Sequence, residues 1–341
     1  MKILVTGGLG YIGSHVVVEL INEGYDVVII DNLSNSSIEV LDGIEAITKV
    51  RPVFEKLDLR EKSSVETFFN NYPEVTGVIH FAASKAVGES VEQPLLYYEN
   101  NINSLVYLVQ QLNSRSNTHF IFSSSCTVYG QADNLPITES APTKPAESPY
   151  GNTKQIGEEI IKDLCKVSPD FSAIALRYFN PIGAHESAKI GELPLGIPQN
   201  LVPFITQTAI GKREQLSVFG DDYPTEDGTC IRDYIHVVDL AKAHVKALSR
   251  LIDNQNKDNF EVFNVGTGKG SSVLEVIKAF ENISGQNLNY KIVDRRAGDV
   301  VSAFADTQKA NSILGWKSIY SLEDALLSSW KWEQQLQNSS K

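Results

Sequence analysis

The stretch Thr6-Gly7-Gly8-Leu9-Gly10-Tyr11-Ile12-Gly13 decides the fold of this 341-residue chain. It follows the apolar run 2–6 and opens a helical pattern that continues to Leu20. Glycines are needed where a backbone turns sharply, approaches a pyrophosphate and packs a helix on a strand. The N-terminus of the next helix then offers N–H groups to the anion. The stretch therefore predicts a dinucleotide site at the first turn, built on Gly7, Gly10 and Gly13.

The acidic residue that such a site needs stands at the end of the second predicted strand. Asp31 lies about 20 residues beyond the glycines, where an acid binds the ribose hydroxyl in dinucleotide sites. Asn32 follows it, and no Arg or Lys stands nearby. A carboxylate here would repel a 2′-phosphate and hydrogen-bond a 2′-hydroxyl. The sequence therefore favours NAD over NADP.

Short β-branched runs alternate with helical patterns along the first half of the chain, the pattern of βαβ units. Several runs are apolar on consecutive positions, as expected for parallel strands covered by helices on both faces. The sequence therefore predicts an α/β fold with a doubly wound parallel sheet, a Rossmann domain over residues 1–180. The predicted strands are 2–6, 25–31, 51–57, 77–82, 119–125 and 172–178.

The residue composition of the sequence changes after about Asn180. Gly, Pro and polar residues fill 191–200 and 220–228 before helical patterns resume. We expect a smaller α/β substrate domain over 181–341, because a chain of this length fits two joined domains of about 100–200 residues each. The segment 234–265 again has a helical pattern followed by a strand pattern, and we expect it to return to the first domain.

The charge balance and the cysteines exclude several classes of protein. The formal charge of -12 argues against binding to nucleic acid or acidic membranes, because these need clustered Lys and Arg. No apolar run approaches the roughly 18 residues of a membrane span, and no signal peptide opens the chain, so we expect a cytoplasmic protein. The three cysteines, Cys126, Cys165 and Cys230, are spaced like neither a zinc site nor a disulfide framework, and no metal site is predicted.

A second group of residues carries reactive chemistry. Tyr150 and Lys154 share one face of a predicted helix, where a cationic amine can lower the pKa of a phenol. The fifth predicted strand ends in Ser123-Ser124-Ser125, which puts hydroxyls at the carboxyl edge of the sheet, where such folds bind ligands. A turn or cap serine is the alternative interpretation of Ser125. We interpret Ser125, Tyr150 and Lys154 as a catalytic triad.

Together with the glycine turn, this triad resembles the extended short-chain dehydrogenase/reductase family. Within it the chain is similar to the UDP-galactose 4-epimerases over nearly its whole length, weakening only over the last ~10 residues, where termini vary. The resemblance implies an NAD-dependent isomerase that interconverts UDP-glucose and UDP-galactose through a 4-keto intermediate. The stretches that carry it are His80-Phe81-Ala82-Ala83-Ser84-Lys85-Ala86-Val87-Gly88-Glu89-Ser90, Leu176-Arg177-Tyr178-Phe179-Asn180-Pro181, Asp222-Tyr223-Pro224-Thr225-Glu226-Asp227-Gly228-Thr229 and Ile231-Arg232-Asp233-Tyr234-Ile235-His236-Val237.

The resemblance also implies the remaining site residues. Arg232 and Arg296 are planar cations suited to a diphosphate, and the alternative for them is ion pairing with their neighbours Asp233 and Asp299. Besides the triad, the residues that would line NAD are Gly7, Gly10, Tyr11, Ile12, Gly13, Asp31, Asn32, Asp58, Leu59, Phe81, Ala82, Lys85, Asn100 and Tyr178. Besides Ser125 and Tyr150, the residues that would hold the UDP-hexose are Lys85, Asn180, Asn200, Leu201, Ser217, Val218, Phe219, Arg232, Arg296, Asp299 and Ala303.

In the mechanism that the resemblance implies, Tyr150 is held ionised by Lys154 and takes the proton of the 4-hydroxyl. Ser125 would hydrogen-bond the same oxygen. The keto sugar must present its other face before hydrogen returns to carbon 4, so NAD is expected to stay bound through turnover.

Two other functions remain open at this point. A sugar-nucleotide 4,6-dehydratase or decarboxylase would share the fold, NAD and the tyrosine. Such relatives resemble one another in an acidic residue just after the catalytic serine or threonine, whereas Cys126 and Thr127 stand here. A non-catalytic NAD-sensing protein is the second alternative, since fold does not dictate function. It would be expected to lack Tyr150 or Lys154, and both are present.

Two finer expectations also come from the resemblance. The position of Ala303 resembles a gate beside carbon 2 of the sugar, where a tyrosine accompanies narrow hexose specificity and smaller residues accompany N-acetylhexosamines. We expect UDP-GlcNAc and UDP-GalNAc to interconvert as well, unless Phe304 or a neighbouring loop fills the space. The resemblance also implies a homodimer whose subunits are joined through two helices each. The apolar runs 97–112 and 156–164 could form that contact, or could simply cover the sheet.

Overall fold

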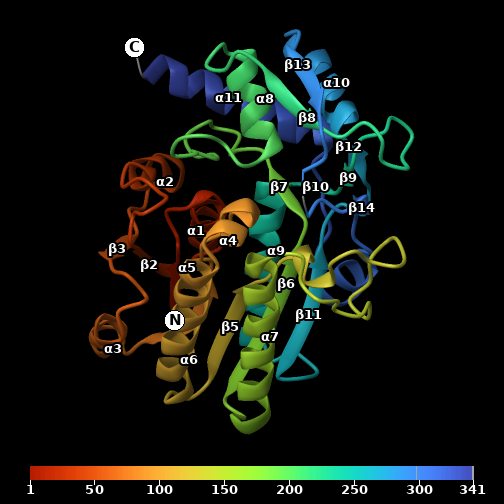
Figure 1. Cartoon of the computed structure of the whole chain (residues 1–341). Coiled ribbons are helices and arrows are strands. Elements are labelled where there is room, and N and C mark those ends of the chain that lie inside the picture. Colours follow the sequence, from red (N-terminus) through yellow and green to blue (C-terminus); the bar gives the residue numbers. More distant parts are fainter. Residues whose placement is uncertain (297, 340–341) are drawn as a thin grey trace.

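The computed structural model describes residues 1–296 and 298–339 of the chain. Within these residues seven parallel strands form one sheet, in the order β11-β6-β5-β4-β1-β2-β3 (Figure 1). The order runs outward from β1 in both directions, as in a doubly wound sheet. The strands are β1 (Lys2–Thr6), β2 (Asp26–Asp31), β3 (Val53–Lys56), β4 (Val75–His80), β5 (Thr118–Ser123), β6 (Phe171–Tyr178) and β11 (Phe260–Val265).

Helices cover both faces of this sheet, because its strands are apolar on consecutive positions. In β1, Ile3 and Val5 join the core on one face and Leu4 joins the core on the other, since successive strand residues point to opposite faces. The predicted α/β doubly wound fold is confirmed. The first face is covered by α1 (Tyr11–Asn22), α2 (Val40–Thr48) and α9 (Val237–Ile252), and the second by α3 (Lys62–Asn71), α6 (Ser104–Asn113) and α7 (Pro149–Val167).

The observed strands agree with the predicted ones to within two residues at either end. The difference that matters is at β5, which ends at Ser123. Ser125 lies beyond the strand and is the N-cap of a 3₁₀ turn, Cys126–Tyr129. Between β4 and α6 the chain forms two short helices, α4 (Val87–Glu92) and α5 (Pro94–Tyr98), and a π-helical turn at Glu99–Asn103.

Most of the second half of the chain forms a separate group of elements above the carboxyl ends of the central strands (Figure 1). In a doubly wound fold this edge is where ligands bind, so the group is placed to form the other wall of a ligand site. Its core is formed by α8 (Leu201–Ala209), α10 (Val273–Ser284) and α11 (Leu322–Ser339) around the paired strands β8 (Leu216–Phe219) and β13 (Tyr290–Val293).

Two small sheets lie between this group and the central sheet. In the first, β7 (Asn180–Ile182) pairs with β10 (Tyr234–His236). In the second, β9 (Ile231–Arg232) pairs with β12 (Ser271–Ser272) on one side and with β14 (Ser302–Ala303) on the other. A π-helical turn at Ala310–Leu314 precedes α11.

The segment 234–265 supplies elements to the central sheet. Strand β11 pairs with β6 at the edge of the sheet, and α9 packs against α1 on one face. The division of the chain into 1–180 and 181–341 stays a prediction.

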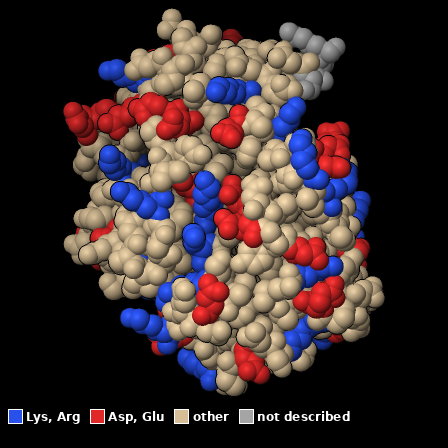
Figure 2. All heavy atoms as spheres, turned by 180° about the vertical axis from the view of Figure 1, so that it is seen from behind, with Lys and Arg blue, Asp and Glu red and all other residues tan. Residues whose placement is uncertain are grey.

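The surface is mixed in charge. On the face drawn in Figure 2, Lys and Arg side chains are scattered among Asp and Glu side chains instead of gathering into one basic area. A phosphate backbone binds to clustered cations, and this face presents no such cluster among the described residues. Among the described residues no helix is both long and apolar enough to cross a bilayer.

Candidate active site

The glycine turn admits only glycine at two of its positions. Gly7 has φ of +66°, in the left-handed region. A Cβ on Gly13 would lie 2.2 Å from the Gly7 carbonyl oxygen, so α1 approaches the turn this closely only without one. The first backbone bond of α1 runs from the Ser14 N–H to the Gly10 carbonyl at 2.9 Å. The N–H groups of the first helical turn therefore face outward from the helix end, and the turn fits a dinucleotide pyrophosphate.

Asp31 joins the end of β2 to this turn. Its carboxylate accepts hydrogen bonds from the Leu9 N–H at 3.2 Å, the Leu33 N–H at 2.9 Å and the Ser36 hydroxyl at 2.8 Å. A carboxylate has about four acceptor positions, so capacity for a ribose hydroxyl remains. The acid that the sequence predicted for this purpose thus lies beside the glycine turn.

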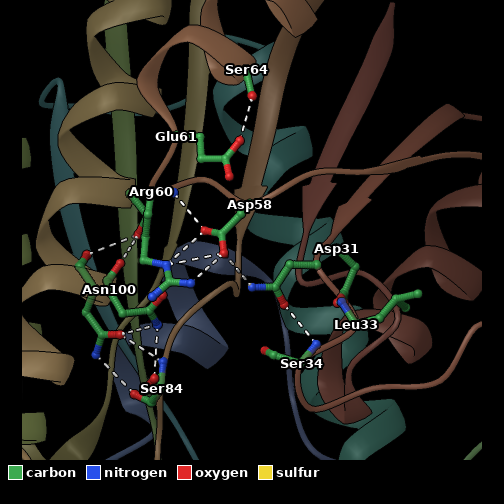
Figure 3. Close-up of polar contacts among 12 residues, drawn as sticks. Asp31, Leu33, Ser34, Asp58, Arg60, Glu61, Ser64, Ser84 and Asn100 are labelled. Atoms are coloured by element: carbon green, nitrogen blue, oxygen red, sulfur yellow. Dashed lines mark hydrogen bonds and ion pairs between the residues drawn. The ribbon is translucent and has the colours of Figure 1, made fainter.

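Asp58 and Asn32 meet at the carboxyl ends of β2 and β3. The Arg60 guanidinium donates to the Asp58 carboxylate at 2.7 Å (Figure 3). The Asn32 amide donates to the same carboxylate at 3.2 Å. The hydrogen bond from Arg60 lowers the pKa of Asp58 to about 2, so this acid is ionised. These side chains line a hollow of about 680 Å³. The Leu59 side chain is buried in the core, so only its backbone can reach a ligand.

Phe81 and Ala82 pass against the glycine turn after β4 ends. The Phe81 N–H donates to the Thr6 carbonyl at 3.0 Å. A Cβ on Gly7 would lie 2.8 Å from the Ala82 nitrogen, so the two loops approach each other as closely as glycine permits. Both predicted residues therefore belong to the dinucleotide end of the site.

A set of amides holds the next part of this loop. The Asn100 side chain donates to the Ser84 hydroxyl at 3.0 Å (Figure 3), and the Ser84 N–H donates to the Asn101 side chain at 2.8 Å. Asn101 also donates to the Thr153 hydroxyl at 3.0 Å, which ties the loop to α7 between Tyr150 and Lys154.

Glu192 brings two predicted ligand residues together. Its carboxylate accepts a hydrogen bond from the Asn200 side chain at 2.6 Å and lies 3.6 Å from the Lys85 ammonium. Lys85 follows β4, whereas Asn200 is the N-cap of α8, so Glu192 connects the two walls of the site. The sequence did not point to Glu192.

The Ser125 hydroxyl and the Tyr150 phenol meet beyond the end of β5. Both residues are buried, at 7% and 8% exposed. Ser125 lies close enough to the Tyr150 phenol to lower its pKa, and it accepts from the Thr127 N–H at 3.2 Å, so it caps the 3₁₀ turn. Tyr150 stands in the first turn of α7, where the Ser148 side chain caps the helix by accepting from the Gly151 N–H. The alternative interpretation of Ser125 as a cap serine is therefore confirmed, and its catalytic role stays a prediction.

Lys154 lies one turn after Tyr150 on the buried face of α7. Its Nζ is 5.8 Å from the centre of the Tyr150 ring and donates to the Ser123 carbonyl at 2.7 Å. Burial lowers the pKa of Lys154 to about 8. Burial also raises the pKa of the Tyr150 phenol well above its ordinary value, Tyr178 adds to the rise, and the hydrogen bond with Ser125 opposes it. Burial thus opposes the lowering of the phenol pKa that was predicted from Lys154.

Tyr178 and Asn180 lie at the ends of β6 and β7. The Tyr178 hydroxyl is 2.7 Å from the Ser123 hydroxyl, which places the ring beside the triad. The Asn180 N–H donates to the Asp233 carbonyl at 2.9 Å, so the strand that carries Asn180 runs beside the strand that follows Arg232.

The two arginines proposed for the diphosphate converge on one acid. Arg232 lies 3.4 Å from the Asp299 carboxylate and Arg296 lies 3.0 Å from it. The predicted alternative pairing with Asp233 is wrong for Arg232, because the Asp233 carboxylate is fully buried and accepts from Thr267, Gly268 and Ala305 instead. Two guanidinium groups on one carboxylate leave donors for an anionic ligand.

Ala303 lies on β14, opposite Arg232 in the pairing of β14 with β9. It is 8% exposed and packs with Val128 and Phe179. Phe304 packs on Gly270, since a Cβ there would lie 3.1 Å from the Phe304 ring. Successive strand residues point to opposite faces, so the Phe304 ring does not fill the place of a side chain at 303.

The remaining predicted UDP-sugar residues lie on two elements of the second half. Ser217, Val218 and Phe219 are on β8, and Leu201 begins α8. The Val218 side chain is fully buried in the core, so only its backbone can reach a ligand. The Phe219 ring is 41% exposed and lies 5.7 Å from the Arg296 guanidinium. A half-exposed aromatic beside a cation suits stacking on a base.

A buried ion pair behind the triad was also missed. Arg177 on β6 donates two hydrogen bonds to the Glu158 carboxylate on α7. Both residues are 7% exposed. The spacing of Lys154 and Glu158, one helical turn apart, was the only sequence signal for it.

This chain is similar to other proteins over nearly its whole length. A sequence model of the family described as GDP-mannose 4,6 dehydratase matches residues 4–328. The UDP-glucose 4-epimerase of Bacillus subtilis (strain 168) is 50% identical over 333 residues, which cover 98% of this chain and 97% of that protein. The chain belongs to the UDP-glucose 4-epimerase family. A member from Drosophila melanogaster is 47% identical over 342 residues and covers 98% of this chain and 97% of its own length.

Solved structures of this family share the fold described above. The UDP-glucose 4-epimerase of Stenotrophomonas maltophila, with bound NAD and formylated UDP-arabinopyranose, has a TM-score of 0.94 and 45% identity, and the match covers 99% of each chain. The enzyme of Bifidobacterium longum, in complex with NAD+ and UDP, gives the same TM-score, identity and coverage. The predicted family membership is confirmed.

Proposed function

We propose that this chain is an NAD-dependent isomerase that interconverts UDP-glucose and UDP-galactose by inverting the hydroxyl at carbon 4. The observation that carries the proposal is the convergence of Ser125 with Tyr150 at the carboxyl end of β5, with Lys154 one helical turn away. An acid/base pair at this edge of a doubly wound sheet lies where a dinucleotide and its substrate meet. Near-full-length identity to epimerases supports the same activity.

The chain's residues divide the work between the two ends of the substrate. Arg232 and Arg296 would bind the diphosphate, and Phe219 would stack on the uracil. Tyr150 would take the proton of the 4-hydroxyl and later return it, while Ser125 hydrogen-bonds the same oxygen. Because binding at the nucleotide end leaves the hexose loosely held, the keto sugar can present its other face. When bound, NAD supplies a hydride acceptor that returns the hydride, and its positive ring adds a cation beside the phenol.

The residues of the first turns would hold NAD. Gly7, Gly10 and Gly13 admit the pyrophosphate at the N-terminus of α1, and Asp31 would accept from the ribose hydroxyl. The high phenol pKa in the chain alone means that Tyr150 needs positive charge close by before it can act as a base. Lys154 supplies one such charge, and its pKa of about 8 keeps it mostly protonated at neutral pH.

A 4,6-dehydratase or decarboxylase is the second candidate, because the dehydratase family model also matches. Such relatives resemble one another in an acidic residue just after the catalytic serine or threonine, where it can act as a general acid or base. Burial raises the pKa of the Cys126 thiol to about 11, and Thr127 is a hydroxyl, so neither residue can serve. The epimerase is therefore the function that the site supports best.

We further propose that UDP-GlcNAc and UDP-GalNAc are substrates. The support is the small side chain of Ala303 and the position of the Phe304 ring on Gly270, away from it. An acetamido group at carbon 2 would meet a methyl group here instead of an aromatic ring. Overpacking by a ring would cost about 1–3 kcal/mol.

We also propose that the chain is a cytoplasmic homodimer. Leu105, Leu108 and Ile161 from the two apolar runs are buried against the sheet within one chain, so covering the sheet is one of their roles. Val106 on α6 and Ile160 on α7 are only half-buried, and a partner's helices would cover them. Analytical ultracentrifugation tests this assembly: a sedimentation coefficient of one chain at micromolar concentration would exclude it.

The proposed activity is tested on protein purified without added cofactor. We expect heat or acid to release NAD from it, and the untreated protein to bring UDP-glucose and UDP-galactose to the same equilibrium mixture from either side. Formation of a 4-keto-6-deoxy sugar nucleotide would support the dehydratase instead, and nucleotide binding without turnover would support a sensor.

A further inference from the structure

Three consecutive serines, the last residue of β5 and the two that follow it, lie against α7. The Ser123 carbonyl accepts from the Lys154 ammonium at 2.7 Å. The Ser124 hydroxyl donates to the Glu158 carboxylate at 2.5 Å. The third serine, Ser125, lies beside the Tyr150 phenol and lowers its pKa. The backbone that presents Ser125 to the substrate is thus tied to α7 at the two residues before it.

Glu158 is the only one of these groups that the proposed mechanism does not use. It stands one turn after Lys154 on the buried face of α7, and Arg177 on β6 donates to both of its oxygens. The Arg177 guanidinium in turn lies 4.8 Å from the centre of the Tyr129 ring. A buried charge costs several kcal/mol to desolvate, and a pair that only fills space is often replaceable by apolar residues. A pair whose carboxylate also accepts from Ser124, the neighbour of Ser125, and lies one helical turn from Lys154 is a candidate for a functional role.

We propose that Glu158, held by Arg177, is a positioning residue for the catalytic triad: its carboxylate anchors the Ser124–Ser125 backbone and holds Lys154 in its charged form. This inference rests on the proposed epimerase function. It assigns Glu158 no contact with substrate, because the carboxylate is buried behind the triad.

The electrostatic half of the proposal depends on every charged or titratable group around Lys154. Beside Lys154 these are Tyr150 and Glu158 on α7 and His80 on β4. On β6, Arg177 pairs with Glu158, and Tyr178 bonds the Ser123 side chain. Burial lowers the pKa of Lys154 to about 8, and Glu158 opposes this fall. Burial lowers the pKa of His80 to about 3, so His80 is neutral and adds no charge near pH 7. Glu158 is therefore the anion that stabilises the Lys154 ammonium.

The chain contains a matched control for a merely structural role. Arg250 on α9 and Glu261 on β11 form a second helix-to-strand pair, with Nε 2.7 Å from the carboxylate. Its side chains are 8% and 9% exposed, against 8% and 8% for Arg177 and Glu158. Glu261 lies in the same sheet but makes no contact with the triad among the described residues. Loss of either carboxylate should destabilise the fold in a similar way.

The test compares Glu158→Gln with Glu261→Gln in the full-length protein that retains NAD. We expect both variants to be less stable than the wild type in urea. Only Glu158→Gln should move the alkaline limb of the profile of kcat against pH, to a pH about one unit lower, because Lys154 then loses its proton at a lower pH. NMR of lysine labelled with ¹³C at Cε reads the titration of Lys154 without any assay of activity, with Lys154→Met identifying its signal. A lower Lys154 titration in Glu158→Gln supports the proposal. An unchanged titration and pH profile overturns it.

A second variant keeps the proposal testable if Glu158→Gln does not fold. Ser124→Ala removes the anchor of the serine backbone and leaves the ion pair with Arg177 in place. We expect kcat to fall by about threefold to tenfold, the scale of one lost hydrogen bond, with KM and the Lys154 titration unchanged. Unchanged kcat would overturn the anchoring role. Absence of epimerase activity in the wild type would overturn the proposed function, whereas the NMR titration would still decide the role of Glu158.

Discussion

Ala303 and Arg232 occupy opposite positions of two paired strands, β14 and β9. The Asp233 N–H donates to the Ala303 carbonyl at 3.0 Å, which fixes the register. The residue that would border carbon 2 of the sugar is therefore the strand neighbour of the arginine that would bind the diphosphate. A change of the Ala303 side chain should alter which sugar fits the site and should leave binding of the nucleotide unchanged.

The first prediction concerns this residue. Ala303→Tyr should suppress the interconversion of UDP-GlcNAc and UDP-GalNAc by about tenfold to a hundredfold, because the ring would occupy the space of the acetamido group. The UDP-glucose pair should be spared. Steady-state assays of all four UDP-sugars on wild type and variant measure this. Equal effects on both pairs, or a wild type inactive on the N-acetyl sugars, would show that 303 is not the gate.

The second prediction is that Asp31→Ala lets NADP compete better with NAD. Removal of the carboxylate relieves the repulsion of a 2′-phosphate. The variant should also lose stability, since Leu9, Leu33 and Ser36 lose their acceptor. Asp31→Asn is the control that keeps an acceptor and removes the charge. Reconstitution of the apoprotein with mixtures of NAD and NADP measures the preference, and unaltered discrimination in both variants would place selectivity elsewhere.

The third prediction concerns the base. Lys154→Met should lower turnover and shift its pH optimum upward, because the phenol of Tyr150 loses the cation that favours its ionised form. The opposing effect of burial on Tyr150 makes this cation more necessary than the sequence alone suggested. The measurement is kcat against pH for wild type and variant. If the optimum stays in place, Lys154 keeps only a role in binding the cofactor.

The fourth prediction concerns stability in acid. His244 is fully buried, and burial lowers its pKa from 6.5 to about 4. Below about pH 6.5 this imidazole therefore binds a proton in the unfolded chain but stays neutral in the folded chain. The free energy of unfolding falls for this reason as the pH drops from 6.5 toward 4. At pH 5 this residue costs about 2 kcal/mol of the free energy of unfolding relative to pH 7. His244→Phe should lose less stability between pH 7 and pH 5 than the wild type in urea titrations. An identical loss in both proteins would contradict the assignment.

The central sheet was predictable because its signals are local. The glycine turn, the apolar runs and the Tyr150–Lys154 spacing each lie within a few residues of one another, and they act through strand and helix geometry that the sequence determines nearby. The triad residues could be named for the same reason. Apart from the three glycines and Asp31, the substrate-binding and cofactor-binding residues came from resemblance, and the contacts of all of them with ligands stay predictions.

The parts that could not be predicted depend on contacts between distant segments. Glu192 meets Lys85 and Asn200 only because α8 stands over the loop after β4. In the sequence Arg177 is an ordinary residue of a predicted strand, and only the fold brings it against Glu158. The rise that burial causes in the pKa of Tyr150 could not be predicted either, because the sequence does not give the burial of one residue.

Isotope retention at carbon 4 of the hexose tests the central claim most directly. Protein purified with its own NAD is incubated with UDP-glucose that carries deuterium at carbon 4, in ordinary water and without added cofactor. The account predicts that the UDP-galactose formed keeps the deuterium at carbon 4. It also predicts that Tyr150→Phe forms this product at least ~100-fold more slowly, because the variant lacks the positioned base. Loss of the deuterium to water, or full activity of Tyr150→Phe, would contradict it.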